Sequence, residues 1–193
     1  MRKKLESFAT GLSTKKYWIV LGLSFVVFLG SNVYLGMLFE NTGYPVPLIE
    51  GQLRFDASLL RQDFSVLNNN GTLEDYKTIQ YLDLSIMLST AIFFGMLSLF
   101  LFRKKKVKFW RLFGISLSLL FPLSGLLDFV ENMWLLNMLN NPVEFPSWIA
   151  IAYSSFALMK LAVFAVGLIG ILVASLWSKL QFKISNSFIV QQN

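Results

Sequence analysis

Two carboxyl groups and an amide lie inside an otherwise apolar stretch, LLDFVENMWLLNML. Asp128, Glu131 and Asn132 are spaced at i, i+3 and i+4, so a helix places all three side chains on one face. A charged carboxylate that faces lipid is costly, and such residues in membrane helices usually face protein and have a partner. The spacing therefore predicts that a cation or a hydrogen-bond donor lies opposite this face.

The next apolar stretch supplies a cation, Lys160 in FALMKLAVF. At about 1.5 Å per helical residue, Lys160 lies about 18 Å from Trp148, where its stretch begins, and Asp128 lies about 16 Å from Leu139, where its own stretch ends. Antiparallel neighbouring helices would bring the two side chains to one depth. Helical side chains also lean toward the N-terminus of their own helix, so these two lean toward each other. We predict an ion pair between Lys160 and Asp128 or Glu131.

Other polar side chains are expected in the same half of the membrane, which we assign to the outer leaflet. They are Asn32 in the first apolar stretch, Asp83 in the second, and Tyr153 one heptad before Lys160. The inner half contains mainly small residues, which are typical of close helix packing rather than of a conduit: Ser89, Thr90, Gly95, Ser116, Gly167 and Gly170.

Three interpretations of the polar residues stay open. The first is an ion-pair network that only fixes helix register. The second is a site for a lipid-like amphiphile, in which Lys160 binds an anionic or carbonyl oxygen while Asp128 or Glu131 moves a proton. Its substrate-binding residues would be Asn132, Asp83, Asn32 and Tyr153. The third, a proton or ion path, would need polar residues through the inner half as well.

The composition limits the chemistry further. The chain has no cysteine and no histidine, so disulfides, thiol chemistry, His-ligated metals and Ser-His-Asp catalysis are excluded within it. We expect no metal site and no cofactor. Whether the protein is an enzyme is not decided by the sequence.

A membrane location follows from hydropathy. Of the 193 residues 55% are hydrophobic and 15% charged, and the mean hydropathy is +0.58. Four stretches, about 17–39, 73–102, 109–139 and 148–177, have about the 20 apolar residues that span a bilayer. We therefore predict a single membrane domain over residues 1–193, an all-α four-helix transmembrane bundle.

The orientation is predicted from the basic residues. Most of the 17 lysines and arginines flank the apolar stretches at positions 2–4, 15–16, 103–111 and 179–183. Such clusters stay on the cytoplasmic side and also contact anionic headgroups, so the net charge of +6 does not indicate nucleic-acid binding. Both termini are then cytoplasmic, in the inner membrane of a bacterial cell. A cleaved signal peptide is the alternative for the first stretch, but this stretch is too long for one.

The outer loop, residues 40–72, is long enough to contain its own structure. In FDASLLRQDFSVLNNNG one helical face carries Phe55, Leu59, Leu60, Phe64 and Leu67, and residues 68–71 end the helix. This helix would lie on the outer membrane surface or cap the bundle, as a structural lid or as a gate. Thr72 and Asp75 predict a capping box at the start of the second span, and Pro122 predicts a bend in the third.

The motif order FDASLL, GTLEDY, YLDL, FPLSGLLDFVEN, NPVEFP and FALMKL, from Phe55 to Val173, resembles an uncharacterised group of small bacterial four-helix membrane proteins. The resemblance implies the four-helix fold and no activity.

From the residues alone, we favour binding or modification of a lipid-like amphiphile by acid-base chemistry, with membrane lipids as partners. The alternatives are a non-catalytic subunit or assembly factor of a larger membrane complex, and an ion-coupled transport subunit. Other membrane subunits or a second copy of the chain are the further partners that we consider.

Overall fold

The computed structural model describes residues 2–105 and 107–190, and the side chains of these except at 2, 3, 5 and 178–190. The basic side chains expected at positions 2, 3, 106, 179 and 183 lie outside this description. The described residues form helices and no strand. The helices are α1 (Arg2–Gly11), α2 (Thr14–Asn41), α3 (Leu48–Gln52), α4 (Ala57–Asn70), α5 (Leu73–Leu82), α6 (Leu84–Phe102), α7 (Lys108–Asn140) and α8 (Ser147–Val190).

The prediction of four apolar helices is confirmed. Four segments are long and apolar enough to span a bilayer, which indicates a multi-pass membrane protein: Thr14–Asn41, Leu73–Phe102, Lys108–Asn140 and Ser147–Trp177. The second of them comprises α5 and α6. Helix α8 continues beyond its expected end at Trp177 to Val190.

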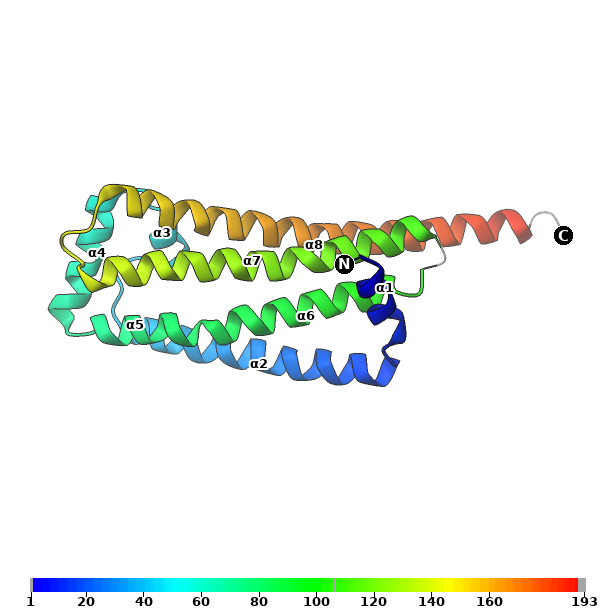
Figure 1. Cartoon of the computed structure of the whole chain (residues 1–193), viewed down its shortest axis with the longest axis horizontal. Helices are drawn as coiled ribbons and strands as arrows, with labels where there is room; N and C mark the ends of the chain where they lie inside the picture. The colour runs from blue at the N-terminus through cyan, green and yellow to red at the C-terminus, as the bar shows by residue number, and fades with distance from the viewer. Residues whose placement is uncertain (1, 106, 191–193) are drawn as a thin grey trace.

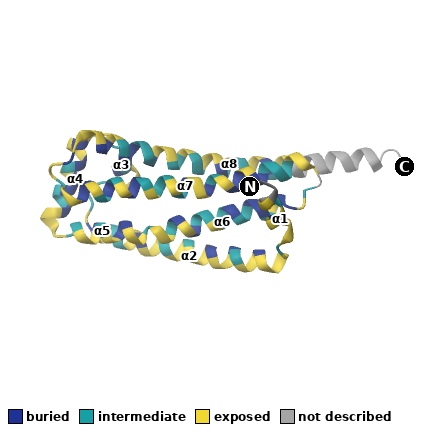
Figure 2. Cartoon of the chain, in the orientation of Figure 1, coloured by how far each residue is buried: buried dark blue, intermediate teal, exposed yellow. Residues whose placement is uncertain are grey.

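The long helices pack in chain order, as an open array (Figure 1). Helix α2 packs mainly on α6, α6 on α7, and α7 on α8. Helix α2 is consequently an edge helix, and much of its surface is exposed along its length (Figure 2). We call the end of the molecule that carries α1, the start of α2 and the α6–α7 loop the basic end.

Two glycines of α8, which have no side chain, allow α7 and α8 to approach each other closely toward the basic end. A Cβ on Gly170 would lie 2.5 Å from Leu117 Cδ2, and a Cβ on Gly167 would lie 2.9 Å from the Phe121 ring. The rings of Phe94, Phe121 and Phe164 contact one another there, with centroids 5.3 to 5.8 Å apart. The expectation that Gly167 and Gly170 serve close helix packing is confirmed.

Helix α7 remains one helix through Pro122. Proline has no N–H to donate to the carbonyl of Ser118, four residues earlier. Helix α6 comes close to that carbonyl at Gly95, where a Cβ would lie 3.3 Å from the oxygen. The expected bend at Pro122 thus does not interrupt the helix, and a glycine faces the carbonyl that the proline leaves free.

Helix α4 caps the ends of α7 and α8 that lie opposite the basic end (Figure 1). Leu60, Phe64 and Leu67 are fully buried against residues such as Met138 and Ala150. The helix ends at Gly71, whose φ of 74° is the left-handed conformation that favours glycine. We expected α4 either to lie on the membrane surface or to cap the bundle, and the structure shows it as a cap.

Two details of the segment between α2 and α5 differ from the expectations. Phe55 precedes α4, which begins at Ala57, so it is not part of the helical face that carries Leu60, Phe64 and Leu67. Thr72 makes no capping box with Asp75: its hydroxyl donates instead to the Thr42 carbonyl at 2.7 Å, which ties the start of α5 to the end of α2.

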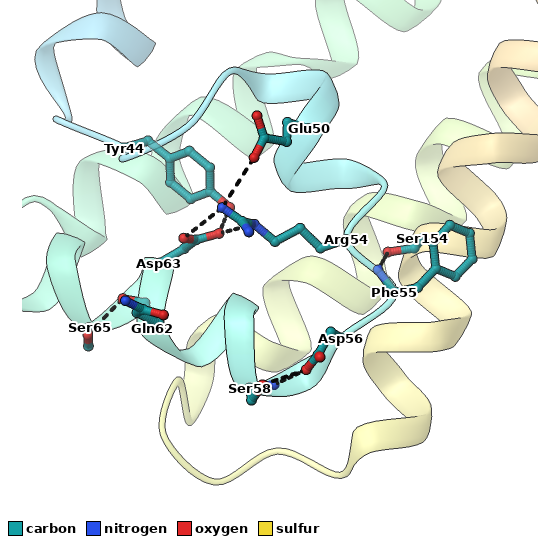
Figure 3. A network of polar contacts seen from close by, with 10 residues as sticks. All are labelled: Tyr44, Glu50, Arg54, Phe55, Asp56, Ser58, Gln62, Asp63, Ser65 and Ser154. Carbon is teal, nitrogen blue, oxygen red and sulfur yellow. Dashed lines mark hydrogen bonds and ion pairs between the residues drawn. The ribbon is translucent and has the colours of Figure 1, made fainter.

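A polar network holds the cap in place (Figure 3). Arg54 Nε lies 2.8 Å from Asp63 Oδ2, Arg54 Nη2 lies 3.6 Å from Glu50 Oε1, and the Tyr44 hydroxyl donates to Asp63 Oδ2 at 3.3 Å. Burial raises the pKa of Tyr44, which keeps its hydroxyl a donor. Burial also raises the pKa of Asp63, and the Arg54 guanidinium opposes that shift. Asp63 therefore depends on Arg54 for its charge.

The segment before α4 is fastened to α8. The N–H of Phe55, a residue with φ of 54°, donates to Ser154 Oγ at 3.1 Å (Figure 3). Arg61 Nη2 donates to the Phe145 carbonyl at 2.6 Å, just before α8 begins. These contacts join both sides of the cap to one helix.

We predict that Arg54→Gln destabilises the protein by about 3 kcal/mol, because it leaves the Asp63 carboxylate buried without its cation. Thermal unfolding in detergent micelles measures the effect. Glu50→Gln is the matched control, since it removes the exposed partner of the same arginine and should cost less than about 1 kcal/mol. Equal effects of the two variants would contradict the assignment.

Candidate functional site

Lys160 on α8 lies between two carboxylates of α7. Its Nζ is 2.6 Å from Asp128 Oδ1 and 2.7 Å from Glu131 Oε2. The Glu131 side chain is fully buried, whereas 13% of the Lys160 side chain and 18% of the Asp128 side chain are exposed. The predicted ion pair is therefore confirmed, with both acids and not one of them as partners.

The register of α7 and α8 is fixed at the same level. Ser124 lies one turn before Asp128 on α7, and its hydroxyl donates to the backbone carbonyl of Lys160 at 3.0 Å. Sequence reasoning did not single out Ser124, although its i, i+4 spacing to Asp128 places it on the acidic face. This contact sets the height at which the ammonium meets the carboxylates.

A third helix joins the site through Asp83 and Asn132. Asp83 lies at the junction of α5 and α6, and Asn132 Nδ2 donates to its Oδ2 at 2.9 Å. Asn132 is buried and Asp83 is half-buried. The structure thus brings together five residues from three helices, which we call the charged cluster: Asp83, Asp128, Glu131, Asn132 and Lys160.

Tyr153 lies beside the charged cluster. It is 1% exposed, two turns before Lys160 on α8, and it packs in the apolar core with Tyr76 and Leu135 under the α4 cap. That core covers the side of the cluster that faces α4. The structure therefore places Tyr153 in the layer next to the polar groups.

Asn32 is a correction, because the structure does not bring it to the charged cluster. Its side chain is exposed on α2, and its Nδ2 donates to the carbonyl of Phe28 in the same helix at 2.7 Å. The physical reason is that the side chain lies on the exposed surface of α2, the helix at the edge of the array. An amide there can bond its own backbone and needs no partner from α7 or α8.

The charged cluster contains more carboxyl groups than cations. Asp128 and Glu131 contact the single ammonium, that of Lys160, and Asp83 joins them through Asn132. Glu131 Oε1 is buried and accepts no hydrogen bond from a described residue. Because charge is costly in a membrane interior, a cluster of this composition favours a bound proton or a bound cationic group. No group of three or more acidic side chains among the described residues is arranged as a metal site.

Apolar layers close the charged cluster toward both ends of the molecule. The α4 cap and its core lie on the side away from the basic end, and the contacting rings of Phe94, Phe121 and Phe164 lie toward the basic end. Phe121 is two turns before Asp128 on α7, and Phe164 is one turn after Lys160 on α8. The partial exposure of Lys160 and Asp128 is therefore lateral, toward the surrounding membrane.

We predict that Lys160→Met destabilises the protein by about 3 kcal/mol, because two carboxyl groups lose their only cation. Adding Asp128→Asn and Glu131→Gln to Lys160→Met should restore most of that loss, since no buried charge is then unpaired. Thermal unfolding of the three forms in micelles gives the comparison. The charge assignment fails if the triple variant is no more stable than the single one.

Comparison of this chain with protein-family models, with curated proteins and with solved structures found no match to any of them.

Proposed function

We propose that this membrane protein binds a lipid-like amphiphile at the charged cluster and exchanges a proton with it. Asp83, Asp128 and Glu131 are the proton-carrying groups, and Asn132 orients Asp83. Lys160 keeps the acidic side chains together. The observation that carries the proposal is the excess of carboxyl groups over cations at a polar site between three membrane helices.

The geometry revises the role expected for Lys160. An ammonium held at 2.6 and 2.7 Å by two carboxylates is already neutralised, so it is a poor anchor for an anionic ligand. A ligand whose polar group donates hydrogen bonds or is positively charged fits the remaining carboxyl oxygens better. A long-chain amine is the simplest amphiphile of that class.

Lateral access supports an amphiphile over a transported ion. The phenylalanine layer toward the basic end and the capped core on the outer side leave apolar side chains on both sides of the charged cluster. A proton or ion path would need polar groups through these layers. A molecule that enters from the bilayer does not cross them. With the positive-inside pattern we also propose an inner-membrane location with both termini cytoplasmic.

Binding of dodecylamine, dodecanol and laurate to the purified full chain, measured by native mass spectrometry from a neutral detergent, tests the ligand class. We expect the amine to bind most tightly and the carboxylate least. Asp83→Asn and Glu131→Gln should each weaken amine binding about tenfold, since each removes one charge-assisted contact. Asp75→Asn, an exposed acid on α5, is the control and should bind as the wild type does. Laurate binding as tightly as the amine would refute the proposal.

Infrared spectroscopy tests whether a carboxyl group of the charged cluster is protonated. Because three carboxyl groups share one ammonium, we expect a band of a protonated carboxyl group in the ligand-free protein at neutral pH. This band should shift or vanish in Asp83→Asn or Glu131→Gln and persist in Asp75→Asn. A spectrum without any such band would show that the charged cluster is fully ionised and would remove the acid-base part of the proposal.

A second candidate function, a subunit of a larger membrane complex, is favoured by α2. Val26, Val33 and Met37 are each more than half exposed, and a Cβ on Gly30 would meet nothing within 4 Å. Such a face could pack against another membrane helix as well as against lipid. Co-purification in mild detergent separates the candidates, because a subunit brings a partner and a self-sufficient binding protein does not need one.

A further inference from the structure

A cavity of about 320 Å³ lies at the basic end, away from the charged cluster. It is lined by residues 10–14, which form the turn from α1 into α2, and by Arg103 and Lys104 at the end of α6. The apolar spans begin at Thr14 on α2 and end at Phe102 on α6. The cavity therefore lies at the level where lipid headgroups meet the protein.

Arg103 places a buried cation on this cavity. Only 7% of the residue is exposed, and its guanidinium lies 4.2 Å from the centre of the Tyr17 ring. Nη1 donates to the Leu12 carbonyl at 2.7 Å and Nη2 to Thr14 Oγ1 at 2.9 Å. Both acceptors are neutral, and Nε is buried without an acceptor among the described residues. Hydrogen bonds thus hold the side chain without neutralising its charge.

No carboxylate among the described residues forms an ion pair with Arg103. Glu6 is the only acidic residue in the sequence segments 2–16, 103–111 and 178–193. It lies across a small neighbouring gap from Arg103, but its Oε1 is 2.6 Å from Arg111 Nε. A buried charge without a counter-charge is costly. An anion from outside the chain is therefore the missing partner.

Two further features add positive potential around the cavity. Lys104 lines it as an exposed side chain, and Lys15 and Lys16 are exposed in the first turn of α2. The N-terminus of the 28-residue α2 opens beside them and contributes the positive end of the helix dipole. At headgroup depth the abundant anion is the phosphate of a lipid.

We propose that this cavity binds the phosphate headgroup of an anionic phospholipid. Arg103 supplies a positive charge that hydrogen bonds hold in place, and Lys104 supplies a second positive charge on an exposed side chain. Residues 10–14 line the rest of the cavity. The site would fasten the α1–α2 turn to one leaflet, independently of the amphiphile site in the other half of the molecule.

The test compares phosphatidylglycerol with phosphatidylcholine of the same acyl chains, each titrated into the full chain in neutral detergent and followed by native mass spectrometry. We expect preferential binding of phosphatidylglycerol. Gly11→Leu fills the cavity without changing any charge, and since a Cβ there meets nothing within 4 Å it should fold normally. It should abolish the preference. Lys104→Gln should lower phosphatidylglycerol affinity about fivefold, because it removes one hydrogen-bond donor that contacts the bound headgroup.

Lys108→Gln is the matched control, because it removes one exposed charge at the same end without lining the cavity. It should change the affinity by less than about twofold, because Lys108 does not contact a headgroup bound in the cavity and exposed charges contribute little at longer range. Gly11→Leu that binds phosphatidylglycerol as the wild type does would overturn the proposal, and so would equal losses in Lys104→Gln and Lys108→Gln, which would indicate diffuse attraction. Displacement of the lipid by an equal concentration of inorganic phosphate would overturn the lipid assignment in favour of a free-anion site.

Discussion

The ammonium of Lys160, held between Asp128 and Glu131 inside the membrane domain, is the interaction on which the site depends. A cation at that depth requires acidic partners, and these acids require the cation. The mutual requirement fixes the height of α8 against α7, and Ser124 fastens the same height through the backbone of Lys160. Asn132 then extends the polar region to Asp83, so that one electrostatic constraint orders three helices.

The sequence allowed this part of the site to be predicted because the depth of a residue in the membrane follows from the number of residues between it and the end of its helix. Helical rise is constant, and antiparallel neighbours of similar length bring residues at equal distances from one loop to equal heights. A charged residue within an apolar span also has few acceptable surroundings, so its partner can be named from the adjacent span. The helix ends could be placed to within a few residues for the same reason, except where α8 continues into a polar segment.

Lateral arrangement could not be predicted in this way. Asn32 lies in a span with the right polarity, but no pattern in the sequence states that α2 is an edge helix that reaches mainly α6. The hydrogen-bond partner of Thr72 could not be predicted for the same reason. Its spacing to Asp75 fits a capping box, but the Thr42 carbonyl, 30 residues away in sequence, is its acceptor in the fold. Contacts between segments distant in the chain decide such cases, and a single sequence does not contain them.

Lys160 and Arg103 show two solutions to one physical problem. Both are cations with little exposed surface, Lys160 near the middle of its apolar span and Arg103 directly after the end of another. For Lys160 the chain provides an excess of acid, so the imbalance that is left is negative. For Arg103 it provides only neutral acceptors, so the imbalance is positive. Because uncompensated charge in a low-dielectric region is costly wherever it lies, the sign of each imbalance indicates the charge of what should bind there: a proton or a cationic group at the charged cluster, and an anion at the basic end.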